Sequence, residues 1–145
     1  MGIRRPAAVA VMAIGFVWGL ALHAQSRETY KARISAVPAD ARTRPSLAGL
    51  GTATATLTGA KLSVTGSFDG LLSPATMAQL HNAVAAGVRG PVLADLTVSK
   101  ATGGTLSGSV DLTPEQVEHL HKGGLYIEIH SEKAPDGVIW GWLMK

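Results

Sequence analysis

The sequence predicts an all-β fold, either a Greek-key β-sandwich or a flattened barrel of about seven to eight antiparallel strands, with one short connector helix. Beyond residue 30 the chain consists of short segments rich in Thr, Val, Ser and Gly, in which apolar and polar residues alternate. Turn signals separate these segments at regular intervals. The chain has 145 residues and no cysteine, so we expect one domain over residues 27–145 whose core needs no disulfides.

Alternation and turn signals together give the position of each strand. Residues 27–46 are expected to form an N-terminal strand and a polar loop, and residues 47–145 the main β-sandwich. The segments on either side of residues 58–60 are expected to form a hairpin. The predicted strands cover residues 30–37, 51–57, 61–68, 77–81, 92–99, 105–112, 125–130 and 138–144.

One helix is expected directly after the strand that ends at residue 112. Thr113 is a favourable N-cap, Pro114 suits the first helical position, and Gln116 completes a capping box. Gly123 is expected to end the helix. A helix of this length has about two to three turns, which is typical of a connector between strands.

Residues 1–26 have the three-part pattern of a secretory signal peptide. Arg4 and Arg5 precede an uncharged apolar run of 16 residues, and polar sequence follows it. A 16-residue helix rising about 1.5 Å per residue spans roughly 24 Å, which is less than the ~30 Å of a hydrocarbon core, so cleavage is favoured over a permanent anchor. We expect Arg27 to be the first mature residue. The protein is then expected to be periplasmic or secreted, with no membrane contact after cleavage.

The charge of the predicted domain argues against one class of partner. Without Arg4 and Arg5 the chain has 11 basic residues against 10 acidic ones, a net charge of +1. Nucleic-acid binding requires a strong basic patch. We therefore expect no nucleic-acid partner.

From residue 47 onward the chain contains, in order, the motifs GTATATLTG, VTGSFDGLLSPAT, LH at 80–81, GPVLADL, GTLSGSVDLTPEQ, KGGLYIEIHS and PDGVIWGWL. Together these motifs resemble the chordin-type (CHRD) domain family, in its bacterial exported form. The resemblance covers roughly residues 47–143 and depends on the order and spacing of the motifs. It implies an all-β extracellular or periplasmic domain, and it implies fold and location better than activity.

Two motifs depart from the family pattern. The family pattern Ala-His-Ile-His-Gly corresponds to AQLHN here, so Gln79 stands in place of the first histidine. The missing histidine weakens the case for a metal site and argues against redox turnover like that of a dismutase. The pattern Gly-Glu-Ile-Arg-Gly-Gln corresponds to GVIWGW, with Trp140 and Trp142 in place of Arg and Gln.

Alternation also predicts a cluster of metal-ligating side chains on the outer face of the domain. Residues 125–131 read LYIEIHS, and burying the Leu and Ile side chains leaves Glu128 and His130 on the outer face. The same argument places His81 outward. If the strands are neighbours, His81 and His130 can share a metal ion, and imidazole with thioether ligands favours copper, especially Cu(I). Additional ligands or rim residues would be Gln79, Glu128, Met77 and Met144.

The same residues allow two interpretations that need no metal. The two histidines would be structural if they hydrogen-bond to loops and hold the ends of the strands. The outer face would instead bind a periplasmic or extracellular protein if its aromatic residues are exposed, because such residues are enriched at binding hot spots. Reversed parity of the last strand would bury its tryptophans and remove much of this surface. The interaction patch would contain Tyr126, Trp140 and Trp142, with Val138 and Met144 on the same face.

No motif predicts an enzyme. The chain has no G-x-S-x-G, no H-E-x-x-H and no phosphate-binding loop. His119 and His121 lie two residues apart on the predicted helix and do not face each other, so we expect neither to ligate a metal. The sequence therefore predicts a non-enzymatic, exported binding module, with copper as the candidate ligand.

Overall fold

The computed structural model of the protein describes residue 2 and residues 24–145. The predicted signal peptide lies almost entirely outside these residues. Within the described part of the chain, no helix has both the length and the apolar character needed to cross a membrane.

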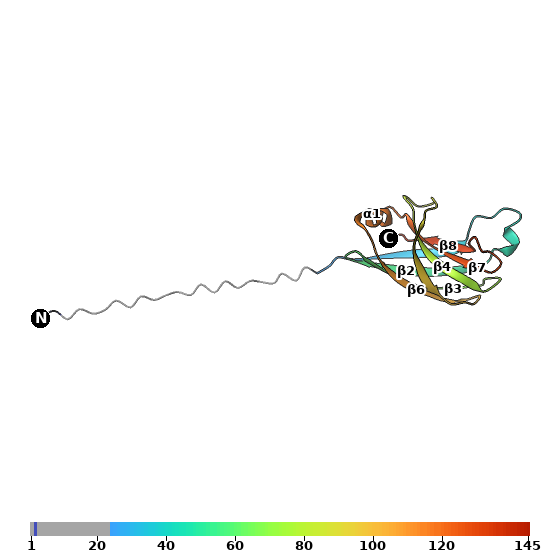
Figure 1. Cartoon of the computed structure of the whole chain (residues 1–145), viewed down its shortest axis with the longest axis horizontal. Coiled ribbons are helices and arrows are strands. Elements are labelled where there is room, and N and C mark those ends of the chain that lie inside the picture. The colour runs from blue at the N-terminus through green and yellow to red at the C-terminus, as the bar shows by residue number, and fades with distance from the viewer. Residues whose placement is uncertain (1, 3–23) are drawn as a thin grey trace.

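Within residues 24–145, eight antiparallel strands close into a barrel in the order β1-β2-β3-β6-β5-β4-β7-β8, which confirms the predicted all-β fold (Figure 1). The connections from β3 to β4 and from β6 to β7 each skip two strands, as the predicted Greek-key connectivity requires. The α-helix α1 (Pro114–His121) and the 3₁₀ helix η1 (Arg44–Ser46) lie toward opposite ends of the barrel. The strands are β1 (Arg27–Ala36), β2 (Leu50–Thr58), β3 (Lys61–Asp69), β4 (Ala75–Asn82), β5 (Val92–Val98), β6 (Gly104–Asp111), β7 (Leu125–Ser131) and β8 (Ile139–Trp142).

Two short pairings divide the barrel into sheet-like halves. Strand β1 pairs with β8 at two positions, with one further bridge between Lys31 and Met144, and β5 pairs with β6 at two positions. By contrast, β1 pairs with β2 at nine positions and β3 with β6 at eight. One half is therefore β1-β2-β3-β6 and the other is β5-β4-β7-β8. This arrangement explains why the sequence pattern fits both a sandwich and a barrel.

Alternating side chains fill the interior of the barrel. On β7, Leu125, Ile127 and Ile129 are each fully buried and belong to the apolar core. Successive side chains of a strand point to opposite faces, so Glu128 and His130 must lie on the outer face of the barrel wall. The core packing of β7 thus positions the candidate metal ligands.

Helix α1 begins as the sequence predicts. Thr113 Oγ1 accepts a hydrogen bond from the Gln116 amide at 3.2 Å, and Gln116 Oε1 accepts one from the Thr113 amide at 2.9 Å. Gly123 follows the helix with a φ of +73°, a conformation that favours glycine. Leu120 is buried in the core cluster and attaches the helix to the barrel.

The last strand differs from the prediction. Strand β8 ends at Trp142, and Val138, which was expected on the outer face, is fully buried in the core. Val138 precedes the strand, and its amide donates to the Ile129 carbonyl at 2.8 Å, which turns its side chain inward. Trp140 and Trp142 keep the predicted parity, and both are half-buried.

Candidate metal centre

The strand register brings the predicted ligands together on one face. Strand β7 lies between β4 and β8. Its outer-face residues Glu128 and His130 pair with Gln79 and Met77 of β4, and His81 pairs with Tyr126. Residues opposite each other on neighbouring strands have Cβ atoms about 5 Å apart. The expectation that these three strands are neighbours is therefore confirmed.

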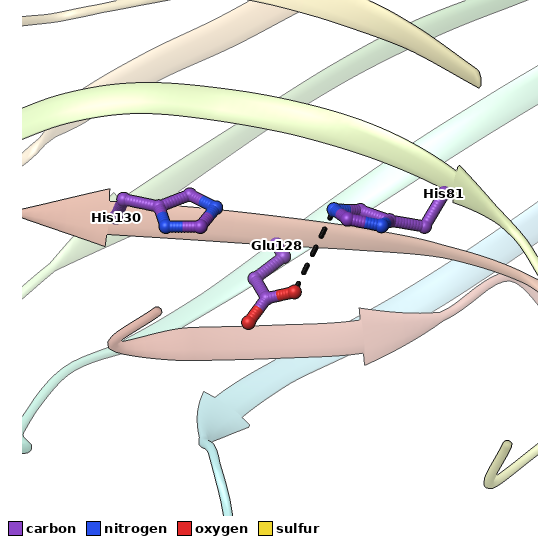
Figure 2. Close-up of side chains that lie close together, drawn as sticks. All are labelled: His81, Glu128 and His130. Atoms are coloured by element: carbon purple, nitrogen blue, oxygen red, sulfur yellow. Dashed lines mark ion pairs between the residues drawn. The ribbon is translucent and has the colours of Figure 1, made fainter. Parts of the chain in front are cut away.

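His81, Glu128 and His130 form a compact triad. Each side chain offers a ligand atom, and the three atoms lie within 4.8 Å of one another. His81 Nε2 lies 3.6 Å from Glu128 Oε2. Figure 2 shows the two imidazole rings on either side of the Glu128 carboxylate, with His81 carried by β4 and the other two side chains by β7.

Backbone carbonyls orient both imidazole rings. His81 Nδ1 lies 2.9 Å from the Gly90 carbonyl, and His130 Nδ1 lies 2.8 Å from the Pro135 carbonyl. A carbonyl can only accept, so each Nδ1 must carry a proton and donate it. Both Nε2 atoms are buried and have no hydrogen-bond partner among the described residues. Carbonyl-anchored Nδ1–H with a free Nε2 is the usual arrangement of a metal-ligating histidine.

The Glu128 carboxylate is held by a cation from a loop. Its side chain is 2 % exposed, and Arg89 Nη1 donates to Oε1 at 3.1 Å and to Oε2 at 3.3 Å. The Arg89 guanidinium also lies 4.7 Å from the ring centroid of Trp140. Gly137 packs so closely on the carboxylate that a Cβ at this position would overlap Oε1. Arg89 therefore stabilises a buried charge that would otherwise be strongly unfavourable.

An aromatic cluster borders the triad. The rings of Tyr126 and His81 stack with centroids 4.7 Å apart and an interplanar angle of 9°. Trp142 lies 4.4 Å from Tyr126, and Trp140 lies 5.6 Å from each of these two rings. These aromatic side chains shield one side of the site from water.

The burial of Tyr126 corrects the predicted interaction patch. Tyr126 is fully buried, and its hydroxyl interacts with the backbone of Gly90. It is therefore inaccessible to a partner protein. Trp140 and Trp142 are half-buried and keep part of their surface exposed.

Comparison with known proteins identifies the family. The model of the CHRD domain matches residues 31–143. The chain belongs to the CHRD domain family. The match begins within β1, so it extends N-terminally of residue 47, where the resemblance of the motifs begins. No match was found among curated proteins, nor among solved structures.

Of the additional ligands predicted from the sequence, Glu128 belongs to the triad. Two of the others lie next to the triad, and one lies elsewhere. Gln79 shares the outer face, but its Nε2 donates to Asp95 Oδ1 of β5 at 2.9 Å. Met77 pairs with His130 across the strands and is 45 % exposed. Met144 does not belong to the site, because it lies beyond β8 and bridges to Lys31 of β1. The expectation of Met144 as a ligand or rim residue is therefore wrong.

The histidines of helix α1 also lie apart from the triad. His119 Nδ1 interacts with Asn82 Oδ1 at 2.9 Å, and His121 Nε2 with Glu28 Oε2 at 3.0 Å. Neither belongs to the three-residue group that brings ligand atoms together among the described residues.

Arg89 and the residues that anchor the triad are the functional features that the sequence reasoning missed. Arg89 and Gly90 lie in the loop between β4 and β5, and Pro135 and Gly137 in the turn before β8. Loops have no periodicity from which a side-chain direction can be predicted. The glycine and proline residues signalled turns, but nothing in the sequence indicated that these turns fold over the triad.

The triad of this CHRD domain has the composition of a three-ligand metal site. Two imidazoles with one carboxylate bind Zn²⁺ in known catalytic sites and form the facial triad of iron oxygenases. Ligand atoms bonded to one ion at about 2.0–2.2 Å lie roughly 3–4 Å apart. The described spacing of up to 4.8 Å needs only small side-chain rotations to reach this geometry. Three protein ligands leave at least one coordination position for water or another donor.

Proposed function

We propose that this CHRD domain binds a divalent transition-metal ion, with Cu²⁺ preferred, through His81, Glu128 and His130. The observation that carries the proposal is a pair of buried Nε2 atoms that have no hydrogen-bond partner among the described residues and converge on a buried carboxylate. A buried polar atom without a hydrogen bond is unfavourable by about 1–3 kcal/mol. A bound cation would satisfy both imidazoles and the carboxylate together.

The third ligand, Glu128, decides which oxidation state of copper we propose. Cu(I) prefers soft ligands, and a thioether would have favoured it. Glu128 supplies a hard carboxylate oxygen at the centre of the site, whereas Met77 is largely exposed at its rim. We therefore favour Cu²⁺ over Cu⁺. Among divalent ions, the general affinity order places Cu²⁺ above Zn²⁺.

The proposed role is that of a non-enzymatic binding module outside the cytoplasm. The signal-peptide pattern of residues 1–26 supports export. The absence of recognisable catalytic motifs in the sequence supports a binding role. Copper capture or buffering in the periplasm or the extracellular space is consistent with both.

A metal-free role for the same residues has support from the hydrogen bonds of both Nδ1 atoms to loop carbonyls and from one further distance. His81 Nε2 and Glu128 Oε2 are 3.6 Å apart, which fits an ion pair if the imidazole carries a second proton. In that case the triad would be a structural element of the barrel wall. Titration of the protein with metal separates the two functions.

Isothermal titration of the purified protein with Cu²⁺ in air, and with Cu⁺ under anaerobic conditions, tests the proposal. We expect one Cu²⁺ per chain and weaker binding of Cu⁺. Bound Cu²⁺ should also quench the fluorescence of Trp140 and Trp142, which border the triad. His81→Ala and His130→Ala should each abolish binding.

His119→Ala is the matched control, because it removes a histidine that lies outside the triad. We expect this variant to bind Cu²⁺ like the unmodified protein. A parallel titration with Zn²⁺ tests whether another divalent ion binds. If neither Cu²⁺ nor Zn²⁺ binds stoichiometrically, or if His119→Ala and His81→Ala lose the same affinity for Cu²⁺, the proposal is overturned and the structural role is supported.

A further inference from the structure

A cationic cleft shares a wall with the metal centre. It has a volume of about 400 Å³ and lies between the loop that contains η1 and the turn at residues 133–137. Arg42, Arg89 and Lys133 line it, and Asp136 is the only acidic lining residue among those that the structure describes. Within the described part of the chain, the side chains of Arg42 and Lys133 form no ion pair with a carboxylate. The cleft therefore carries an excess of positive charge.

The remainder of the lining limits the kind of anion that fits. Apolar side chains contribute part of the wall, among them Val37, Leu47 and Ala134. Ser46 adds a hydroxyl group. Guanidinium groups bind carboxylates through paired N–H donors. Cations combined with apolar surface favour a small carbon skeleton that carries more than one carboxylate.

Three contacts connect the cleft to the triad. Arg89 lines the cleft and also holds Glu128. Pro135 lines the cleft, and its carbonyl accepts the hydrogen bond that orients His130. Gly137 lines the cleft and packs against the Glu128 carboxylate. A ligand in the cleft thus contacts residues that set the geometry and charge of the metal centre.

We infer that this cleft binds a small organic anion with at least two carboxylate groups, and that the anion and the metal bind cooperatively. An anion that binds the Arg89 guanidinium weakens the ion pair between Arg89 and Glu128. The Glu128 carboxylate is then available to the metal. The metal in turn adds positive charge beside the cleft and attracts the anion. By thermodynamic reciprocity, each ligand raises the affinity for the other by the same factor.

The anion site stands without the proposed metal function, and only the cooperativity depends on it. Titration of the metal-free protein with succinate tests the site, and titration with inorganic phosphate tests whether the carbon skeleton matters. We expect succinate to bind and phosphate to bind at least about tenfold more weakly, because phosphate makes no use of the apolar wall. Equal or tighter binding of phosphate would overturn the assignment to dicarboxylates.

The double variant Arg42→Gln/Lys133→Gln removes two cations of the cleft and no residue of the triad. We expect it to weaken succinate binding at least about tenfold, since charged hydrogen bonds contribute strongly. Lys61→Gln is the control, because Lys61 is exposed on β3 and does not line the cleft. Circular dichroism confirms that each variant is folded. Absence of succinate binding to the folded protein, or equal losses in variant and control, would overturn the anion site.

Cooperativity is measured by repeating the succinate titration with the Cu²⁺-loaded protein. Succinate is suitable because it chelates copper weakly. We expect the affinity for succinate to rise about fivefold or more, within the usual range of coupling between sites. An unchanged affinity would overturn the cooperativity. If the protein failed to bind Cu²⁺ at all, the proposed function would fail while the succinate result still decided the anion site.

Discussion

The two faces of strand β7 are both buried, but they differ in chemistry and in what covers them. The inner face carries Leu125, Ile127 and Ile129, which lie in the barrel interior. The outer face carries Glu128 and His130, which lie beneath two loops that contribute Arg89 and Pro135. One face is covered by the rest of the barrel and the other by connections between strands.

This difference shows how one strand can serve stability and chemistry at once. Burial of the inner face is favourable by about 25 cal/mol for each Å² of apolar surface removed from water. Burial of a carboxylate and two imidazoles on the outer face is unfavourable unless each polar atom is paired. The unpaired Nε2 atoms of His81 and His130 show that this compensation is incomplete among the described residues. Incomplete compensation is what we expect of a binding site whose ligand supplies the missing partner.

Ile127→Ala tests the inner face and has the largest expected effect. Removing a fully buried side chain from a packed interior lowers the free energy of unfolding by about 2–5 kcal/mol. Urea denaturation measures this change. Met77→Ala, on the outer face of β4 and 45 % exposed, should lower it by less than about 1 kcal/mol. Similar losses in both variants would contradict the assignment of the two faces.

Saturation with metal tests the outer face. At a free Cu²⁺ concentration about 100 times the dissociation constant, binding should stabilise the folded protein by about 2.7 kcal/mol. EDTA should remove the increase in melting temperature. His81→Ala should melt at the same temperature with and without the metal. A metal-induced increase that persists in His81→Ala would show that the ion binds somewhere else.

Gly137→Ala tests how closely the outer face is packed. The substitution places a Cβ against Glu128 Oε1, at a backbone φ of +119°. We expect the affinity for Cu²⁺ to fall about tenfold or more, with a loss of stability of about 1–3 kcal/mol from the strained backbone.

Gly87→Ala is the matched control for this substitution. It introduces the same kind of backbone strain, at a φ of +80°, but its Cβ would have no neighbour within 4 Å. We expect a loss of stability without a loss of affinity for Cu²⁺. Equal affinities in the two variants would contradict a role of Gly137 in positioning Glu128.

The exposed pair of His121 and Glu28 is expected to give the smallest effect, in contrast to the buried pair of His81 and Glu128. Hydrogen bonds from Tyr30, Lys145 and His121 lower the pKa of Glu28 from 4.5 to about 2. A lowered pKa in the folded state means that these contacts stabilise the fold above pH 4.5 and lose this effect as the pH falls toward 2. Melting temperatures over this interval should fall more steeply for the unmodified protein than for Glu28→Gln. Parallel profiles would show that these contacts of the Glu28 carboxylate contribute nothing.

The strands and the composition of the triad were predictable from the sequence. Once the Leu and Ile residues of LYIEIHS are assigned to the core, a strand period of two leaves no choice for Glu128 and His130. Glu128 was treated as an additional ligand beside Gln79, and the structure makes it the third member of the triad. Gln79 is instead drawn toward Asp95, because β5 lies beside β4, an adjacency that local periodicity does not contain.

The cover of the outer face could not be predicted. Tyr126 was expected to be exposed because alternation distinguishes the two faces of a strand without saying what lies above each. Arg89 lies in an irregular loop, where no periodicity predicts the direction of a side chain. The pairing that closes the barrel joins β1 to β8, which lie more than a hundred residues apart in the chain. Such contacts join segments far apart in the sequence, so local periodicity could not reveal the environment of the triad.

The two short pairings between the barrel halves have a consequence for hydrogen exchange. Segments with few inter-strand hydrogen bonds open locally at a much lower free energy than the fold as a whole. We expect amides at the pairings of β1 with β8 and of β5 with β6 to exchange first. All three members of the triad lie on β4 and β7, within one half and away from both openings. The barrel can therefore open locally at these two pairings while the strands that carry the triad stay paired.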